Sequence, residues 1–557
     1  MEMKWWKEGI VYQIYPRSYK DTTGNGIGDL NGIIQKLDYI QSLGVDIIWL
    51  NPIYASPNDD NGYDISDYRV IMPEFGTMND FERLLEGLHE RGLKLIMDLV
   101  VNHSSDEHEW FQQSRSSRNN EYRNYYHWWP AEKGIPPTRW SYFDIESNAW
   151  TYDTQTDSYY LHYFSKKQPD LNWENPKLRQ EIYDMMRFWF DKGVDGFRMD
   201  VISFISKNID FPVLPKGSVP EDFIEFYAHG PRLHEYLNEM NREVLSHYDV
   251  MTVGEAPGIT LEDALDIVDE ERKELDMFFH FDLMTLDREE GEVFKMNPDG
   301  WSLSQFKNIF GEWDATFAEK GWGSIFLGNH DFPRMVSRWG NDRKSHWYHS
   351  STMLHTFLMT MRGTPYVYYG DEIGMTNIRF ETIGQYKDIN TINKYRQLEN
   401  QGEDLNSFLA DQKEASRDNA RTPMQWDQTS NAGFSRSSPW IEINKNYLSG
   451  VSVAFQEESE NSVLNFFRKI VAIRKKNLAL VYGQYEEVDV ENENVYAYLR
   501  KGENVTFLIL LNFCDKNSFI KLPRHFETLN WELVISNDVV NRDEMLPYQC
   551  IVYKTFT

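Results

Sequence analysis

The chain has 557 residues, of which 41% are hydrophobic, and its formal net charge is −30. This length exceeds an ordinary single domain and predicts one large barrel with a smaller domain attached. The acidic balance argues against nucleic acid and anionic membrane surfaces as partners, because both would repel the protein. The sequence has no apolar run of the roughly 18 residues that a membrane span requires, and we expect neither a span nor a signal peptide.

Only two cysteines occur, Cys514 and Cys550, both near the C-terminus. Such sparse use does not build a disulfide scaffold and indicates a reduced, cytoplasmic setting, although one bond between the two stays open. We expect a monomer that needs no organic cofactor.

Short apolar runs that alternate with helical patterns predict the strands of the main domain. The candidates span residues 9–16, 45–54, 93–103, 194–201, 250–255, 323–331 and 364–372. Near-continuous apolar strands separated by helices are typical of a parallel sheet covered on its outer face. Seven or eight such units predict an α/β fold, a closed (β/α)8 TIM barrel, more than an open sheet.

The clearest helix is predicted over residues 175–193. Asn175 suits the N-cap, Pro176 suits the first helical position, and Gly193 suits the stop. One apolar stripe runs along this segment through Ile182, Met185, Met186 and Trp189.

The domain organisation follows from three changes of pattern. The catalytic barrel is expected over residues 1–103 and 169–476. Residues 104–168 are rich in Trp, Tyr, Ser, Asn and Pro, and predict an excursion domain after the third strand. Residues 477–557 alternate or run apolar without helices between them, and predict a C-terminal antiparallel β-sandwich.

Polar residues fall where the predicted strands end, which is where barrel enzymes carry their active sites. Arg198 and Asp200 are two residues apart, so on a strand they face one side, and Glu255 ends another strand. Two such carboxylates suit glycoside cleavage. We expect Arg198 to lower the pKa of Asp200, and the apolar run before Glu255 to raise the pKa of Glu255. A purely structural ion pair is the competing interpretation.

Several motifs resemble the α-amylase superfamily, glycoside hydrolase family 13. "DLVVNH" (98–103), "GFRMDV" (196–201), "VGE" (253–255) and "GNHD" (328–331) resemble its four ordered regions. Three further segments resemble its oligo-1,6-glucosidase subgroup: "QPDLN" (168–172), "SPNDDNGYDISDY" (56–68) and "RDNARTPMQW" (417–426). The resemblance covers essentially the whole chain. Each motif alone is weak, and seven in the right order are strong.

The resemblance implies roles for three carboxylates. Asp200 resembles the nucleophile that forms a covalent glucosyl-enzyme, and Glu255 resembles the general acid and later base. Asp331 resembles the third carboxylate, which holds sugar hydroxyls and stabilises the transition state.

The resemblance also implies a glucose pocket. Asp60 and Arg417 resemble the pair that closes it, which makes an exo-acting enzyme, and Arg421 ranks below Arg417. Tyr63 would stack beneath the ring; a rim tyrosine is the alternative. The segment "WSYFDIESNAW" (140–150) departs from the family's two-phenylalanine, two-glycine form. The remaining predicted pocket residues are Asp98, His103, Phe143, Arg198 and His330. For Asp98 the alternative is a structural role that orients its neighbours, and for His103 it is a metal ligand or a core histidine.

The loop "DTTGNGIGD" (21–29) resembles the family's calcium loop. Its ligands would be Asp21, Thr23, Asn25, the Ile27 carbonyl and Asp29, with an EF-hand type of spacing. Only two carboxylates remain, and fewer charges mean weaker binding. A metal-free, glycine-rich turn is the equal alternative.

Val201 follows the proposed nucleophile. In the subgroup, valine there accompanies cleavage of α-1,6 bonds, so the resemblance implies an exo-acting, retaining oligo-1,6-glucosidase. Dextran glucosidase, trehalose-6-phosphate hydrolase and α-1,4-glucosidase are its neighbours, whereas "NHDFPRMVSRWGND" (329–342) does not resemble sucrose isomerases. A non-catalytic transporter heavy chain shares the fold, but it needs an anchor and lacks catalytic residues, whereas all three carboxylates are present here.

Overall fold

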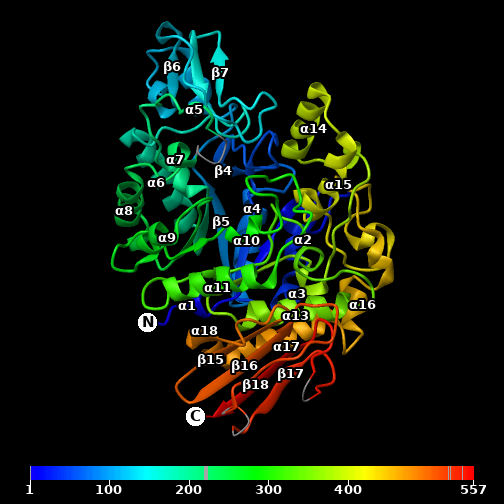
Figure 1. Ribbon diagram of the computed structural model, residues 1–557. Coiled ribbons are helices and arrows are strands. Elements are labelled where there is room, and N and C mark those ends of the chain that lie inside the picture. The colour runs from blue at the N-terminus through cyan, green and yellow to red at the C-terminus, as the bar shows by residue number, and fades with distance from the viewer. Residues whose placement is uncertain (1, 219–223, 525, 527–528, 542–543, 557) are drawn as a thin grey trace.

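The computed structural model describes residues 2–218, 224–524, 526, 529–541 and 544–556, and its largest unit is a sheet of eight parallel strands (Figure 1). The strands pair in the order β11, β10, β9, β5, β2, β1, β13 and β12. Ser324 Oγ donates to Phe278 O at 2.6 Å and thereby joins the two end strands. The bounds are β1 (Val11–Ile14), β2 (Ile47–Leu50), β5 (Lys94–Val100), β9 (Gly196–Asp200), β10 (Met251–Glu255), β11 (Met277–Phe279), β12 (Ser324–Ile325) and β13 (Thr364–Tyr368).

The predicted (β/α)8 barrel is therefore confirmed, with one strand that the sequence analysis missed. This strand is β11, for which no segment was predicted. The other seven strands lie within the predicted segments.

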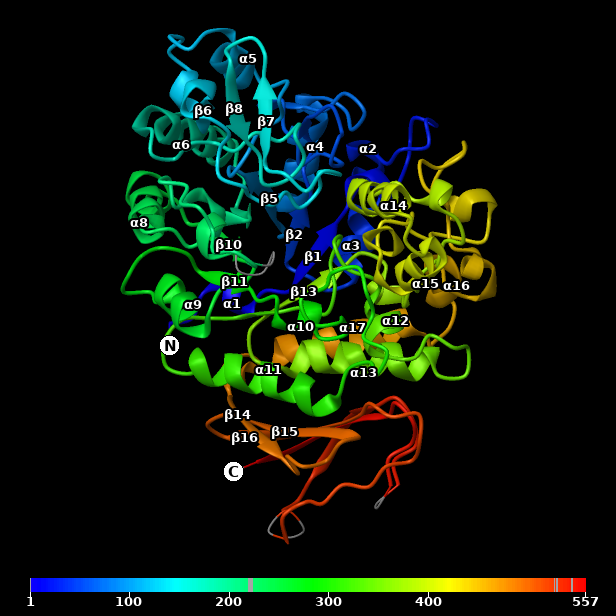
Figure 2. The same ribbon diagram turned by 45° about the horizontal axis from the view of Figure 1, so that its top comes forward.

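Helices cover the outer face of the barrel (Figures 1 and 2). Helix α6 (Pro176–Asp191) is bounded as predicted: the Asn175 side chain accepts from Lys177 N, and Gly193 has φ of 103°. The predicted stripe of α6 is buried, which fixes the helix against the sheet. The other helices are α1 (Trp5–Glu8), α2 (Leu30–Ile34), α3 (Leu37–Ser42), α4 (Met78–Glu90), α5 (Glu109–Ser116), α7 (Ile224–Tyr227), α8 (Leu233–Glu243), α9 (Leu261–Val268), α10 (Asp282–Thr285), α11 (Leu303–Thr316), α12 (Met335–Trp339), α13 (Trp347–Thr360), α14 (Ile389–Gln401), α15 (Leu405–Ala415), α16 (Val453–Glu457), α17 (Val463–Lys476) and α18 (Leu478–Tyr482). Within the described residues, we find no helix with the length and apolar character that crossing a bilayer requires.

The excursion after β5 carries a small antiparallel sheet of β6 (Trp128–Pro130), β8 (Ser158–Leu161) and β7 (Trp150–Asp153), paired in that order. Its two ends are tied together, because Ser104 N donates to Pro169 O and Leu171 N donates to Asn102 O. A separate two-stranded sheet, β3 (Tyr54–Ala55) with β4 (Asp67–Ile71), lies in the segment after β2.

The C-terminal region forms one antiparallel sheet in the order β14 (Gln484–Val488), β15 (Val495–Lys501), β16 (Val505–Asn512), β18 (Cys550–Phe556) and β17 (Glu532–Ser536). One face, which includes Tyr496 and Tyr498, joins the barrel core and packs against α13 (Figure 2). The other face, which includes Ala497 and Leu499, packs against loop residues such as Phe526 and Met545. Among the described residues this second layer is made of loops, so the predicted two-sheet sandwich is not what forms here. Both cysteines are free thiols.

Candidate active site

Three neighbouring strands place their last polar residues together. In register, Asp98 of β5 lies beside Arg198 of β9, and Arg198 lies beside Val253 of β10. Asp200 and Glu255 come two residues further along β9 and β10, so each points to the same side of the sheet as its predecessor. The side chains therefore meet at the carboxyl ends of the strands, as predicted.

Arg198 is the centre of this group. Its Nη1 lies 2.5 Å from Asp98 Oδ1 and 2.7 Å from Asp200 Oδ1, and its Nη2 lies 2.6 Å from Glu255 Oε2. The side chain is 1% exposed. A planar fork of donors suits this task, because it can hold several carboxylates in fixed positions. The predicted contact with Asp200 is present and extends to two further carboxylates.

The two carboxyl groups bridged by Arg198 differ in proton affinity. Burial raises the pKa of Asp200 to about 6, although the charge of Arg198 opposes that rise. Burial raises the pKa of Glu255 to about 8, again against Arg198, and the charge of Asp200 adds to the rise. Arg198 lowers the pKa of Asp200 as expected, but burial outweighs this effect and the net pKa is raised, and the expected rise at Glu255 is also present. At neutral pH Asp200 is mostly ionised and Glu255 is mostly protonated.

Each of these carboxyl groups keeps one oxygen open. Asp200 Oδ1 and Glu255 Oε2 face Arg198, whereas no donor from the described part of the chain contacts Asp200 Oδ2 or Glu255 Oε1. Nucleophilic glycoside cleavage needs one ionised carboxyl group with a free oxygen that can attack, and one protonated carboxyl group that can give up its proton. Asp200 and Glu255 match this pair.

A third carboxylate, Asp331, follows β12 and is held by two arginines. Arg417 Nη1 and Arg421 Nη2 each lie 3.0 Å from Asp331 Oδ1. Burial opposes ionisation of Asp331, but His330, Arg417 and Arg421 outweigh burial and hold its pKa below the usual range. Asp331 therefore stays charged and suits acceptance of hydrogen bonds from sugar hydroxyls.

His330 is fixed as a neutral ring by two polar neighbours. Its Nδ1 lies 2.9 Å from Gln13 Nε2, and its Nε2 lies 2.7 Å from the Tyr63 hydroxyl. Burial lowers the pKa of His330 to about 3. The ring stacks on Tyr63 with centroids 5.3 Å apart, and Asn51 Nδ2 donates to the Tyr63 hydroxyl. Sequence analysis missed Gln13 and Asn51, for which the only signal is an amide inside or directly after an apolar strand.

The predicted pair of Asp60 and Arg417 is present but long, with Arg417 Nη2 3.5 Å from Asp60 Oδ1. The same nitrogen lies 2.5 Å from Asp388 Oδ1, a residue that sequence analysis missed. Burial raises the pKa of Asp60 to about 7 despite Arg417, whereas the pKa of Asp388 falls to about 2 because Arg417 and Arg421 outweigh its burial. Asp388 is therefore the tighter anchor of Arg417.

The excursion domain adds one wall to the pocket. His103 Nε2 lies 3.3 Å from Gln168 Nε2, and Gln168 Nε2 also donates to Asp60 Oδ2. Phe143 is 8% exposed, and the Arg417 guanidinium lies 5.2 Å from the centre of its ring. The departing segment that carries Phe143 thus still places this ring at the predicted site.

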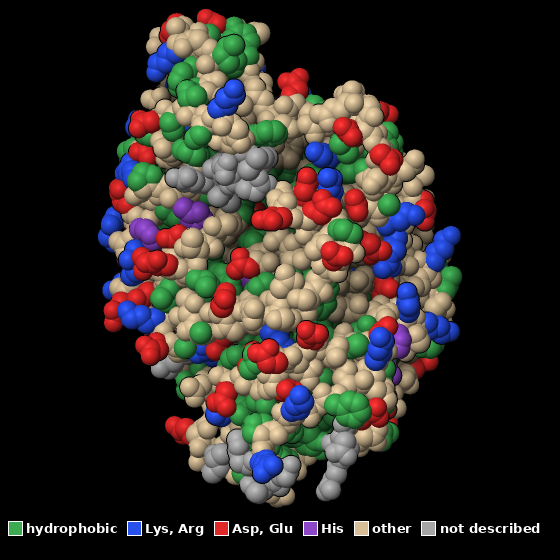
Figure 3. Space-filling model, viewed as in Figure 1, with side chains coloured by type: hydrophobic (Ala, Val, Ile, Leu, Met, Phe, Trp, Pro, Cys, Tyr) green, Lys and Arg blue, Asp and Glu red, His purple; other side chains and the backbone are tan. Residues whose placement is uncertain are grey.

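Helix α14 adds the opposite wall. Asn393 Nδ2 donates to Phe143 O at 2.6 Å, and Gln397 Nε2 donates to Ser147 Oγ at 3.1 Å. In the space-filling view the surface is hollowed between the lobe of β6 and β7 and the lobe of α14 (Figure 3). These two contacts therefore join the two lobes that flank this hollow, which we call the mouth of the site.

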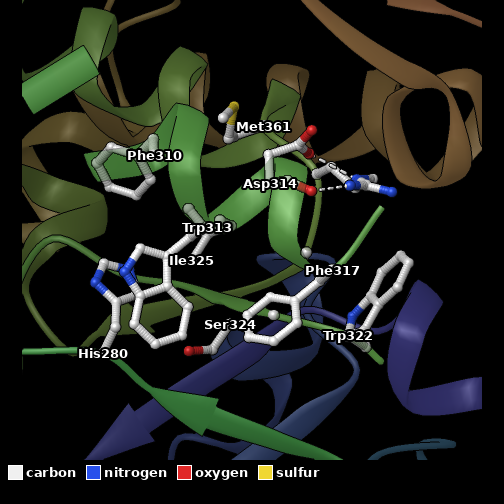
Figure 4. A pocket seen from close by; sticks show the side chains of 12 residues that line it. His280, Phe310, Trp313, Asp314, Phe317, Trp322, Ser324, Ile325 and Met361 are labelled. Atoms are coloured by element: carbon white, nitrogen blue, oxygen red, sulfur yellow. Dashed lines mark hydrogen bonds and ion pairs between the residues drawn. The ribbon is translucent and has the colours of Figure 1, made fainter. Parts of the chain in front are cut away.

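A second hollow lies between α11 and β12 (Figure 4). Its volume is about 20 Å³, and the His280 ring that lines it stacks against Trp313. Such a volume holds about one water molecule.

A sequence profile of the alpha amylase catalytic domain matches residues 13–483. The chain belongs to the alpha-amylase family. A profile of the maltogenic amylase C-terminal domain matches residues 485–551, which hold the C-terminal sheet.

Known members of the alpha-amylase family resemble the chain along its full length. It is 50% identical to the oligo-1,6-glucosidase of Parageobacillus thermoglucosidasius, over 100% of this chain and 99% of that protein. It is 44% identical to the trehalose-6-phosphate hydrolase of Bacillus subtilis, over 99% of this chain and 98% of that protein. Its fold is similar to the crystal structure of the isomaltulose synthase from Protaminobacter rubrum, with a TM-score of 0.95, 45% identity and full coverage of both chains.

The loop that resembles the family's calcium site is closed by hydrogen bonds to its predicted ligands. Asp21 Oδ1 accepts from Thr23 N and Gly24 N, and Asp21 Oδ2 accepts from Gly26 N and the Ser435 hydroxyl. Two of the other predicted ligands are engaged as well: Asn25 Oδ1 accepts from Ile27 N, and Asp29 caps α2 through Gly32 N. No group of three His, Cys, Asp or Glu suited to a metal occurs among the described residues. These hydrogen bonds are compatible with a metal-free turn, and calcium binding by the loop stays a prediction.

Proposed function

We propose that this member of the alpha-amylase family is an exo-acting, retaining oligo-1,6-glucosidase. It would hydrolyse α-1,6 bonds at the non-reducing end of isomalto-oligosaccharides and panose. The observation that carries the proposal is that Arg198 contacts both Asp200 and Glu255. This shared contact holds an ionised and a protonated carboxyl group side by side at the ends of the strands. The full-length similarity to oligo-1,6-glucosidases supports the choice of substrate.

The reaction follows from the two open oxygens. Asp200 Oδ2 attacks the anomeric carbon while Glu255 gives its proton to the departing glycosidic oxygen, and the covalent glucosyl-enzyme forms. Glu255, now a carboxylate, takes a proton from water, and that water attacks the anomeric carbon and releases Asp200. Two inversions leave the α configuration unchanged.

The pocket residues hold the non-reducing glucose in this proposal. Asp331 stays charged and accepts from ring hydroxyls, where hydrogen bonds tighten as positive charge develops. Asp60 and Arg417 close the pocket behind the sugar, so a chain can enter only by its end. The remaining proposed contacts are Tyr63, Asp98, His103, Phe143 and His330.

An unphosphorylated substrate is favoured over trehalose 6-phosphate. The described cations at the mouth already bind carboxylates: Arg198 and Arg417 each hold several, and Arg421 holds Asp331. The buried Lys207 is paired with Asp170 at 3.1 Å. A phosphate would have to compete with these carboxylates.

The proposed setting is the cytoplasm, with a monomer that binds neither nucleic acid nor membrane. Two free thiols and the net charge of −30 support this setting. The non-catalytic alternative is disfavoured by the assembled carboxylates.

The test compares glucose release from isomaltose, panose, maltose, sucrose and trehalose 6-phosphate. We expect isomaltose and panose to be cleaved with the highest kcat/KM. Preferred release from trehalose 6-phosphate or maltose would overturn the substrate assignment, and conversion of sucrose into another disaccharide would indicate an isomerase. The Asp200→Asn variant in the same assay excludes a contaminating enzyme.

A further inference from the structure

Val201, directly after the last residue of β9, has an unusual backbone conformation. Its φ is 33° and its ψ is 44°, which is the left-handed region. A β-branched residue rarely adopts that region, because its side chain crowds the backbone. Such strained positions persist where the surrounding structure enforces them, and they cluster at functional sites.

The surroundings of Val201 do enforce the turn. The Val201 carbonyl accepts from Phe204 N at 2.8 Å, which closes the 3-10 turn over Ile202–Ile205. The side chain is 7% exposed and belongs to a cluster with Phe204, Leu161 and Tyr163. The last two residues come from the excursion domain, so this domain clamps the turn.

The Val201 amide lies in the peptide plane that ends β9, and it faces the neighbouring strand β10. Val201 N donates to Glu255 Oε2 at 3.2 Å, and Arg198 Nη2 lies 2.6 Å from the same oxygen. A carboxyl oxygen that faces two N–H donors has no acceptor beside it for a proton of its own.

We propose that the Val201 backbone amide is a positioning group for Glu255, which together with Arg198 reserves Oε2 as an acceptor and directs the acidic proton to Oε1. This inference rests on the proposed function, in which Glu255 is the acid. It adds that the groups around Glu255 leave one of its two carboxyl oxygens, Oε1, to carry the proton that is transferred. The left-handed conformation of Val201 turns the chain out of β9 directly after this amide and into the 3-10 turn.

A purely structural turn makes a different prediction. In that case the hydrogen bond to Glu255 is incidental, and its loss would affect stability without changing the protonation of Glu255. In our proposal the bond favours the ionised form, so its loss raises the pKa of Glu255. The Val201 amide is indeed among the groups that lower this pKa against burial.

The first experiment replaces the amide by an ester. α-Hydroxyvaline at position 201, introduced by cell-free translation with an acylated suppressor tRNA, removes the N–H and keeps the side chain. We expect the alkaline limb of kcat/KM to move up by about one pH unit, the size of one lost hydrogen bond to a charged group. We also expect isomaltose hydrolysis to fall more than 4-nitrophenyl glucoside hydrolysis, because the poorer leaving group needs the proton more.

The matched control is phenyllactate at position 204, which removes the Phe204 N–H that closes the same turn. It should leave the alkaline limb in place. A limb that moves by less than about 0.3 pH unit in the position 201 ester, or equally in both esters, would overturn the inference. Wild-type protein that releases no glucose would instead defeat the proposed function.

The second experiment needs no variant. Neutron diffraction from deuterium-exchanged wild-type crystals at pH 6 locates the deuteron of Glu255. A deuteron on Oε1 supports the inference, and a deuteron on Oε2 overturns it even if the ester protein does not fold.

Discussion

Asp200 and Glu255 are held by opposite nitrogens of one guanidinium, with Arg198 Nη1 2.7 Å from Asp200 and Nη2 2.6 Å from Glu255. One rigid fork thereby sets the separation of the two carboxyl groups and influences both charges. The pKa values still differ, because burial acts on both while the charge of Asp200 adds to the rise at Glu255. The consequences are measurable.

The first prediction concerns pH. Asp200 attacks only when ionised, and its pKa is about 6, so kcat/KM should fall below that pH. Glu255 donates only when protonated, and its pKa is about 8, so kcat/KM should fall above that pH. We expect a bell-shaped profile for isomaltose between pH 4.5 and 9.5, with both limbs belonging to the coupled pair. A rate that keeps rising through pH 9 would contradict the role of Glu255 as acid.

Replacement of the nucleophile should abolish turnover while the fold persists. Asp200→Asn keeps the size of the side chain and removes the attacking charge, so kcat should fall by at least about 10⁴-fold. Circular dichroism should be unchanged. Asp195→Asn is a matched control, because Asp195 precedes β9 at the opposite end of the strand and pairs with Lys94. Normal activity in Asp200→Asn would remove the proposed nucleophile.

The product should retain the α configuration. The shared guanidinium favours the short separation of roughly 5–5.5 Å between carboxyl groups that retaining enzymes use. Proton NMR during the first minutes should detect α-glucose before it equilibrates. If β-glucose comes first, a water on the far side of the ring is the attacker and no covalent intermediate forms.

The glycine-rich loop should not need calcium. Asp21 already accepts from backbone N–H groups and from the Ser435 hydroxyl at 2.6 Å. We expect the Tm to change by less than about 1 °C on addition of EDTA or calcium chloride. Ser435→Ala should instead cost about 1 kcal/mol of unfolding free energy, the usual worth of such a bond. A calcium-dependent rise of several degrees would show that the loop binds the ion.

Much of the fold is readable from local sequence. Asn175, Pro176 and Gly193 delimit helix α6 because each acts on its own backbone. Strand β11 was not predicted, and its shortness does not explain this, because the two-residue strand β12 lies inside a predicted segment. The C-terminal sheet shows why a sandwich was expected: both faces are apolar, yet one packs against the barrel and the other against loops. The local sequence pattern predicts that a face of a sheet is buried, but it does not predict which part of the protein covers that face.

The site is readable only in part for a similar reason. Arg198 and Asp200 share a face by simple alternation, so their contact follows from spacing. The contact with Glu255 depends on strand order, and Asp388 reaches Arg417 from the start of α14. The lowering of the Asp200 pKa by Arg198 follows from the sequence, but the larger opposing effect of burial does not, because the depth of burial is a property of the whole barrel.

Linkage preference should depend on Val201. The pocket residues bind the same glucose whichever bond is cut, so discrimination arises where the second sugar lies. Val201 adjoins the nucleophile and borders the apolar cluster of Phe204. Val201→Thr keeps the β-branch, and therefore the crowding at φ of 33°, while a hydroxyl replaces one methyl.

A change of that size should alter relative transition-state binding by about 1–3 kcal/mol, or roughly 10- to 200-fold. The measurement is the ratio of kcat/KM for isomaltose to kcat/KM for maltose, which we expect to fall in the variant. Val194→Thr is the matched control, because Val194 is buried just before β9, far from the mouth. It should lower stability and leave the ratio unchanged. An unchanged ratio in an active Val201→Thr protein would mean that Val201 only packs, and that the α-1,6 preference arises from other residues around the second sugar.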